Sequence, residues 1–426
     1  MPNASAASNP PLHTGQSINT KLQIGGSARY RYENKQNFQF GAPTAANSQD
    51  YWLQQLRLHM LWNASSKVHL FVEIQDARIF QGFQGHVINQ QKTPNIFEDH
   101  LDIHQAYLDI FAPIGDMNTR IRMGRQKFNL GAQRMMASLE WVNTARVWDG
   151  IRITSHISPK QTLDVFGSRL VPVNPQRANN HSHTPSRMFN SALSGVYYTD
   201  AQHWLTHTQL EFYALLREEA SFGDRVYTWG HRAAYQQQAW DADYEIMVQT
   251  GTYGHQTQRA HAAHIGIGYQ LENLHTHIAT AYNIGSGDSN PNDNIHQTFD
   301  NQYPLNHAYY GYMDFFSLQN MQNLEFVAQT QWASTWQSRI AWQSFWLLHP
   351  TSDAWYHAGA GVLKKARTGA AHQVGNELDI TLKHKLTSIP GTLYMGYSHF
   401  FTGTYLAQTS TNKAADFAFA QVKLVF

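Results

Sequence analysis

Stretches in which apolar and polar side chains alternate dominate the chain. The segment from Lys21 to Glu33 is the clearest example, because its even positions are apolar or small and its odd positions are mostly polar, including Arg29 and Arg31. A period of two is the spacing of a β-strand with two unlike faces. One face of this predicted strand suits lipid and the other suits water.

The same alternation continues in the segments that follow. Residues 51–63 place Leu56, Leu58 and Trp62 on one face and Arg57 on the other, and a tight turn at 64–66 leads into a third strand. The last strand, Asp416–Phe426, alternates in the same way and ends on an aromatic residue. A terminal Phe on such a strand is similar to the insertion signal of outer-membrane β-barrels, so we expect this strand to pair with the first.

Connections between the predicted strands alternate between short and long. Short ones are expected near residues 64–66, 113–118, 158–160, 199–202, 238–241, 272–273, 333–335 and 386–391. Longer ones are expected near residues 34–48, 81–98, 129–145, 172–187, 218–223, 253–258, 285–319, 349–371 and 403–415. Short periplasmic turns and long extracellular loops are typical of transmembrane β-barrels. The sequence therefore predicts an all-β, antiparallel transmembrane barrel of about 18 strands with both chain ends in the periplasm.

Composition supports this class and disfavours others. No run of about 18 apolar residues is present, which excludes a helical membrane protein. Aromatic residues make up 13% of the chain, as two interfacial girdles would require, and a net charge of +1 argues against a nucleic-acid partner. A soluble β-propeller is the alternative for the periodicity alone, but we find no repeat of blade length.

The chain begins without an apolar signal segment, so we expect the numbering to start near a mature N-terminus. Residues 1–20 are expected to form a flexible periplasmic segment and residues 21–426 a single barrel. The absence of Cys suits export through an oxidising periplasm.

Several motifs go beyond the pattern and carry a resemblance. They include HQAYLDIF at 104–111, RMGRQ at 122–126, WVNTARVWDGIRI at 141–153, DYEIMVQTG at 243–251, HAYYG at 307–311, VGNELDITL at 374–382 and GYSHFF at 396–401. In this order and spacing they resemble the alginate export family of outer-membrane barrels. The resemblance implies a monomeric barrel of 18 strands that exports an acidic polysaccharide and works with a periplasmic scaffold protein.

The predicted interior has a basic wall and an acidic wall. Alternation places the following cations inward on the early strands: Arg29, Arg31, Arg57, Lys67, Arg120, Arg122, Arg146 and Arg152. It places these carboxylates inward on later strands: Asp164, Glu211, Asp243, Glu245, Glu325, Glu377 and Asp379. Arginine binds carboxylates through two oxygens at once, so a basic wall would attract anions. Alternatively, each Arg pairs with a carboxylate across the strands and only braces the wall.

Two features do not follow the simple alternation. Arg125, Lys127 and Asp149 share parity with lipid-facing residues, and we expect Arg125 and Asp149 to pair at the rim of the barrel. The longest loop, Gly285–Gln319, is expected to fold over or into the mouth.

No catalytic set is apparent, so we expect no enzyme activity, cofactor or metal. We name Arg29, Arg31, Arg57, Arg120, Arg122, Arg146, Arg152, Glu245 and Asp379 as candidate pore-lining residues. Three functions remain open: export of an anionic polysaccharide, diffusion of small anionic solutes, and an adhesin or scaffold without conductance. The expected environment is the bacterial outer membrane, with its lipid and lipopolysaccharide as partners.

Overall fold

The structure is a computed structural model that describes residues 16–19, 21–40, 48–82, 96–175, 177–179 and 191–426. Most of the expected N-terminal segment 1–20 lies outside these residues. Its described part, Gln16–Asn19, forms the short strand β1, which pairs with β2 (Leu22–Gln36).

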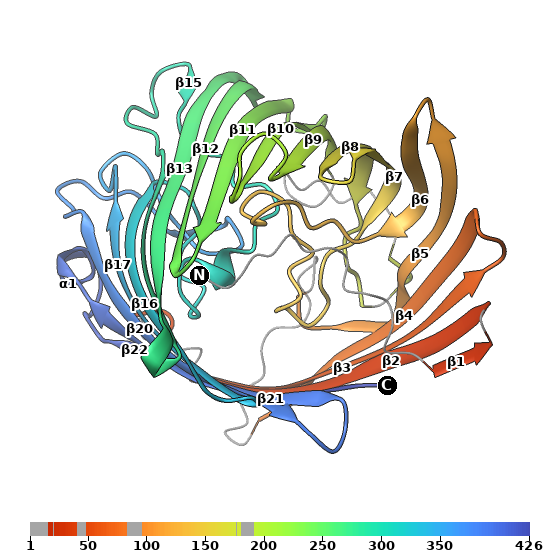
Figure 1. Ribbon diagram of the computed structural model, residues 1–426. Helices are drawn as coiled ribbons and strands as arrows, with labels where there is room; N and C mark the ends of the chain where they lie inside the picture. The colour runs from red at the N-terminus through yellow and green to blue at the C-terminus, as the bar shows by residue number, and fades with distance from the viewer. Residues whose placement is uncertain (1–15, 20, 41–47, 83–95, 176, 180–190) are drawn as a thin grey trace.

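Within the described residues, eighteen antiparallel strands close into a barrel around an interior (Figure 1). After β2 they are β3 (Ser48–Asn63), β4 (Val68–Gln81), β5 (Asp99–Ile114), β6 (Met117–Gln126), β7 (Trp148–Ser158), β8 (Gln161–Leu170), β9 (Ala192–Ala201), β10 (Thr208–Glu219), β11 (Asp224–Gln237), β12 (Trp240–Tyr253), β13 (Gln256–Leu271), β14 (Thr276–Gly285), β16 (Met321–Ala333), β17 (Trp336–Leu347), β20 (Gln373–Leu386), β21 (Gly391–Thr402) and β22 (Ala415–Val425). The barrel closes where β22 pairs with β2, with Lys423 opposite Arg29. Pairing of the last strand with the first is thus confirmed.

The remaining elements are short and lie in connections. They are β15 (Ile295–His296), β18 (Trp355–Tyr356), β19 (Val362–Lys364), η2 (Glu272–Leu274), η3 (Asn306–Ala308) and α1 (Thr404–Thr409). None of the described helices has the length and apolar character needed to cross a bilayer.

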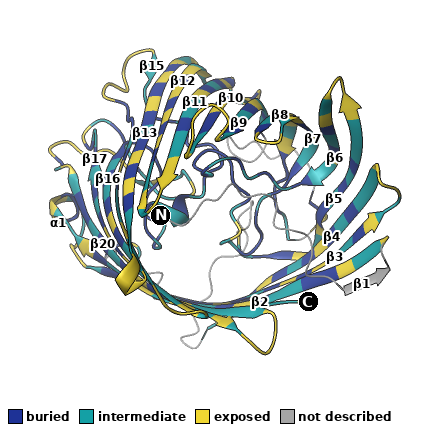
Figure 2. Cartoon of the chain, in the orientation of Figure 1, coloured by how far each residue is buried: buried dark blue, intermediate teal, exposed yellow. Residues whose placement is uncertain are grey.

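The two faces of each strand differ in exposure, as the alternation predicts (Figure 2). On β2, Ile24 and Tyr30 are each 44% exposed, whereas Arg31 is 1% and Glu33 3% exposed. Apolar side chains cover much of the outer wall, and buried charged residues such as Arg31 and Glu33 point inward, where they find polar partners.

Two outer connections are shorter than expected. Strand β10 is followed by β11 after residues 220–223, and β12 by β13 after residues 254–255. The ladders continue to the end of each strand, with Glu219 opposite Asp224 and Tyr253 opposite Gln256. The polar sequence at 218–223 and 253–258 predicted longer loops. The structure instead continues the strand pairing into these segments, so the connecting turns are short.

Two long connections bend into the barrel over much of their length, although β15 of the second lies at the rim beside β13 (Figure 1). We call residues 127–147, between β6 and β7, the first inner loop, and residues 286–320, between β14 and β16, the second inner loop. Their apolar residues form much of a buried cluster with the inner wall, including Leu130, Met136, Phe299, Tyr303 and Phe316. The principal hydrophobic core therefore lies inside the barrel, because these side chains are buried there away from water.

Candidate functional site

The two inner loops are joined to each other across the lumen. Met136 and Tyr303 form a parallel bridge, in which the Ala137 N–H donates to the Tyr303 carbonyl oxygen at 2.8 Å. The Tyr303 N–H donates to the Met135 carbonyl oxygen at 3.1 Å. These bonds satisfy backbone groups that the loops bring into the interior.

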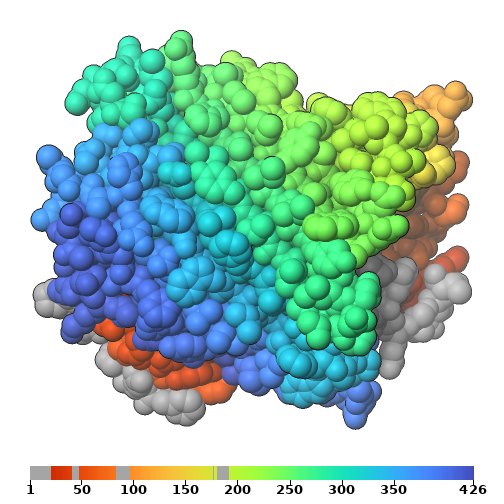
Figure 3. Space-filling view, turned by 60° about the vertical axis from the view of Figure 1, so that its left-hand side comes forward, coloured from red at the N-terminus to blue at the C-terminus, as the bar shows by residue number. Residues whose placement is uncertain are grey.

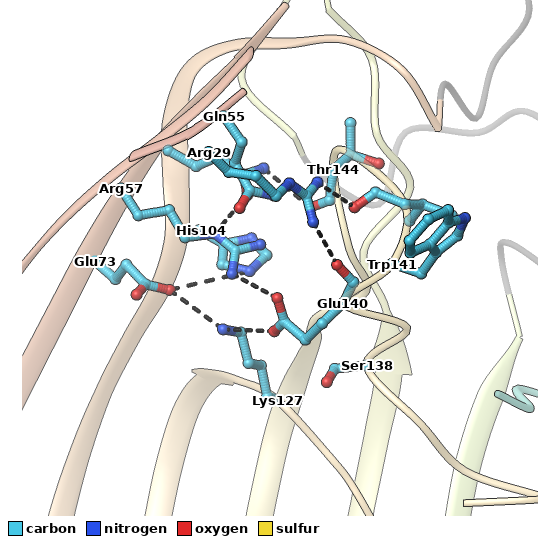
Figure 4. Close-up of polar contacts among 12 residues, drawn as sticks. Arg29, Gln55, Arg57, Glu73, His104, Lys127, Ser138, Glu140, Trp141 and Thr144 are labelled. Atoms are coloured by element: carbon cyan, nitrogen blue, oxygen red, sulfur yellow. Dashed lines mark hydrogen bonds and ion pairs between the residues drawn. The ribbon is translucent and has the colours of Figure 1, made fainter. Parts of the chain in front are cut away.

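The first inner loop is fastened to the basic wall of β2 and β3 (Figure 4). Arg29 donates to the carbonyl oxygen of Glu140 at 2.7 Å, and Arg31 donates to that of Trp141 at 2.8 Å. Arg57 donates to the Glu140 carboxylate at 2.6 Å. Three of the arginines expected to face an open pore therefore bind this loop.

Glu140 is the acidic centre of this junction. Besides Arg57, it contacts the ammonium group of Lys127 at 2.8 Å, and its side chain is 45% exposed to the space inside the barrel. Burial alone would raise the pKa of Glu140, but Arg57 and Lys127 outweigh burial and hold the pKa well below its ordinary value. Glu140 is thus ionised and anchors the loop at neutral pH.

The structure places Lys127 inside the barrel, and not on the lipid-facing side that regular alternation predicts. Regular alternation would have turned it toward lipid, but β6 ends at Gln126 and Lys127 belongs to the first inner loop. Its ammonium group points inward to Glu140 and lies 3.6 Å from Glu73. Arg125 and Asp149, in contrast, form the expected ion pair, with bonds of 2.8 and 3.1 Å.

On the opposite side, the same loop meets the acidic wall through Arg134. This side chain is 2% exposed, and it lies 3.0 Å from Glu245 and 3.7 Å from Asp243 of β12. Burial alone would lower the pKa of Arg134, but Tyr309 and these two carboxylates raise it. The loop therefore presents a carboxylate to the basic wall and a guanidinium to the acidic wall.

The second inner loop is held by Glu377 of β20. The Met313 N–H donates to Glu377 at 2.9 Å, and Asp379, which is fully buried beside Glu377, accepts a bond from the Ser398 hydroxyl. His307 of this loop stacks on Trp141 of the first at a centroid distance of 4.0 Å, and Arg31 covers the Trp141 ring at 3.9 Å. Both inner loops are thus part of one packed assembly.

Two predicted arginines brace neighbouring strands. Arg122 forms two bonds of 2.7 Å with Asp109, and Arg152 donates to Asp164 at 2.7 Å. These pairs match the bracing alternative for inward arginines.

Arg146 was placed wrongly by the alternation. It lies in the first inner loop ahead of β7, and not on a strand. It donates to the Pro304 carbonyl oxygen of the second inner loop at 3.0 Å, and burial lowers its pKa to about 10. Its role in the structure is to link the loops.

Arg120 stands apart from the other predicted arginines. Its nearest polar partner is the Thr154 hydroxyl at 3.4 Å, and among the described residues it makes no ion pair. It lines a cavity of about 730 Å³ together with Arg152, Asp164, Thr199 and Gln209. The cavity extends from the short turns after β5, β7 and β9 to Leu130 and Gly131 of the first inner loop.

Gly131 fixes how closely the loop approaches this cavity wall. Its φ is +51°, a left-handed value, and an added Cβ would lie 2.0 Å from the Tyr197 hydroxyl oxygen and 2.6 Å from a Glu211 oxygen. Only glycine fits this position without moving the loop or the wall.

The inner-loop residues Lys127, Arg134 and Glu140 were not among the predicted site residues. A signal was present, because the segment 129–145 contains Leu130, Met135, Met136 and Trp141. So many large apolar residues are unusual for a loop exposed to solvent, and they indicate burial.

Comparisons with known proteins agree with this architecture. A family model described as alginate export matches residues 20–421. No curated protein matches the chain significantly.

Solved structures share the fold at low identity. The Pseudomonas aeruginosa protein OccK11 (OpdR) is 10% identical with a TM-score of 0.61, covering 95% of this chain and 96% of its own. OccD3 (OpdP) of the same organism is 11% identical with a TM-score of 0.64, covering 97% and 92%. OpdK, crystallised with vanillate, is 10% identical with a TM-score of 0.66, covering 95% and 98%.

Proposed function

The chain belongs to the alginate export family, and from this premise we propose that it is a bacterial outer-membrane pore through which small anionic solutes diffuse. The observation that carries the proposal is Arg120, an arginine that lines the lumenal cavity and has no ion-pair partner among the described residues. Such a charge concentrates anions and lowers the barrier to their entry.

Cavity size favours a small solute. A volume of about 730 Å³ lies within the range of about 300–1,000 Å³ that small-molecule sites occupy. Arg152 also lines this cavity, but its charge is shared with Asp164 at 2.7 Å. Glu211, the second carboxylate that lines the cavity, is likewise paired, with Arg232 at 3.0 Å. Among the described lining residues Arg120 is thus the arginine without an ion-pair partner, which favours a solute with a single carboxylate. The vanillate in the OpdK crystals is a small carboxylate, which makes this class the first to test.

Export of an anionic polysaccharide is the second candidate, and family membership favours it. A polymer needs a continuous conduit along the basic wall. Arg29, Arg31 and Arg57 already bind the first inner loop there, so the loop would have to leave the wall for a polymer to use them. A periplasmic scaffold protein that binds the end of the barrel with the short turns is the partner this mechanism would require.

Solute uptake into proteoliposomes separates these functions. We expect a monocarboxylate sugar acid to enter faster than the neutral sugar of equal size, and an oligouronate of several units to be excluded. In Arg120→Gln the preference for the acid should fall, whereas Lys67→Gln, which removes a cation from the β3–β4 turn, should leave it unchanged. Rapid oligouronate entry would favour polymer export instead, and no uptake of any solute by folded protein would favour an adhesin or scaffold.

A further inference from the structure

Outward-facing arginines gather at one end of the strands on part of the barrel. Arg225 lies one residue after the start of β11, and Arg259 lies three residues after the start of β13. Both share parity with exposed apolar residues of their strands, Trp229 at 56% and Ile265 at 61% exposure. They therefore project from the outer wall, at the end opposite the short turns after β11 and β13.

The two arginines flank the end of β12. Arg225 is opposite Thr252 and Arg259 is opposite Thr250, so both lie at nearly the same height. They are two strands apart, a separation of roughly 10 Å between backbones. We call Arg225, Thr250, Thr252 and Arg259 the arginine patch. Its strands, coloured green, are on the face seen in Figure 3.

Charge in the patch is only partly compensated. Arg225 lies 3.2 Å from Glu218, but both side chains are exposed, at 59% and 46%. Exposed ion pairs of this kind contribute little to stability, so Arg225 can exchange Glu218 for another anion. Arg259 makes no ion pair or hydrogen bond among the described residues, and the Thr252 hydroxyl donates to the Gly223 carbonyl oxygen at 3.1 Å. The patch can thus offer two guanidinium groups and the Thr250 hydroxyl to an anion.

A similar row of charged residues on β6, β7 and β8 differs from the arginine patch in its central residue. Arg125, Asp149 and Arg169 also lie level across β6, β7 and β8. There the central residue is a carboxylate, which takes two bonds from Arg125. In the arginine patch the central residues are threonines, so no acid separates the two arginines.

An apolar groove on the outer wall begins next to the arginine patch on β12 and extends across β11 and β10 to β9. It has a volume of about 590 Å³ and is lined by Val196, Phe212, Trp229, Ile246 and Val248. Val248 precedes Thr250 by two residues on β12, and Trp229 belongs to the same strand as Arg225. A cationic patch next to an apolar groove matches a molecule with an anionic head and a hydrocarbon tail.

We propose that the arginine patch and this groove form a binding site for a phosphate-bearing lipid of the outer leaflet. Arginine binds phosphate through two parallel hydrogen bonds, and the patch lies just above the apolar band, where headgroups are found. The acyl chain would occupy the groove between Phe212, Trp229 and Ile246. This site is on the outer wall and is independent of the pore proposed for the lumen.

The test is the affinity of detergent-purified protein for lipopolysaccharide with both lipid A phosphates, measured by titration calorimetry. Each cation near a membrane surface contributes about 1 kcal/mol to the free energy of binding anionic lipid. The double variant Arg225→Gln/Arg259→Gln should therefore bind lipopolysaccharide roughly 30-fold more weakly than the wild type. Glu218→Gln should bind more tightly, because it frees Arg225. The control Lys67→Gln/Lys160→Gln removes two exposed cations from short turns at the opposite end and should bind like the wild type.

Two further binding measurements identify the ligand. Lipopolysaccharide treated with phosphatase should bind the wild type as weakly as the double arginine variant binds the intact lipid, and inorganic phosphate at the same concentration should not bind. Equal affinity of the double arginine variant and the wild type, or full affinity for the dephosphorylated lipid, would overturn the proposal. Tight binding of inorganic phosphate would identify a free-anion site and would overturn the assignment to lipid.

Discussion

Replacing Glu140 by Gln tests how firmly the first inner loop is held. The substitution keeps the size of the side chain and removes the charge that Arg57 contacts at 2.6 Å and Lys127 at 2.8 Å. Hydrogen bonds to charged groups contribute about 1.5–3 kcal/mol. Glu140 is 45% exposed, so solvent screening reduces the loss to about 1 kcal/mol. The population of the displaced loop should then rise roughly fivefold.

Single-channel recording in planar bilayers measures this change. We expect Glu140→Gln to visit a larger conductance more often, and to become more anion-selective because Arg57 and Lys127 lose the carboxylate that both contact. Glu272→Gln, which makes the same change in the exposed turn η2, is the matched control. Identical current records for Glu140→Gln and wild type would refute the anchoring role of this carboxylate.

Three further predictions concern the same interior. Because the pKa of Glu140 is held below its ordinary value of 4.5, the anchor is fully present above pH 4.5 and is lost as the pH falls through the lowered pKa. Bilayer recording should therefore show the large-conductance state of the wild type increasing only at pH values below 4.5, with no such increase in Glu140→Gln. Arg134→Gln removes the buried guanidinium that lies 3.0 Å from Glu245, while Asp243 keeps Arg232 at 3.6 Å, and the loss should cost about 3 kcal/mol. This should appear as a lower unfolding temperature on heat-shift gels, and an unchanged temperature would contradict the pairing. Gly131→Ala should destabilise by more than about 1 kcal/mol on the same gels, because its φ is +51°, whereas Gly167→Ala, with no atom within 4 Å of the added Cβ, should be nearly neutral.

Strand structure could be predicted because one face of each strand meets lipid and the other meets a polar interior. That difference fixes the parity of Arg29, Arg31 and Arg57, and the structure places all three on the inner face. Beyond the end of a strand, alternation no longer predicts which way a side chain points. Lys127 and Arg146 were assigned by alternation, yet β6 ends at Gln126 and β7 starts at Trp148, so both belong to a loop.

The arrangement of the interior could not be predicted, since it depends on contacts between distant segments. Arg57 and Glu140 are 83 positions apart, and Arg134 and Glu245 are 111 apart. Alternation predicts that Arg57 and Glu245 face inward, but it does not predict that the first inner loop contacts both of them. The apolar residues of that loop indicated burial, and only the folded structure shows against which wall.

The central claim, a pore whose selectivity depends on Arg120, is tested most directly by the reversal potential of single channels in a salt gradient. The wild type should form stable channels whose reversal potential has the sign of anion selectivity, and Arg120→Gln should shift it toward zero while Lys67→Gln does not. Channels with cation selectivity, or the same reversal potential in wild type and Arg120→Gln, would contradict the account.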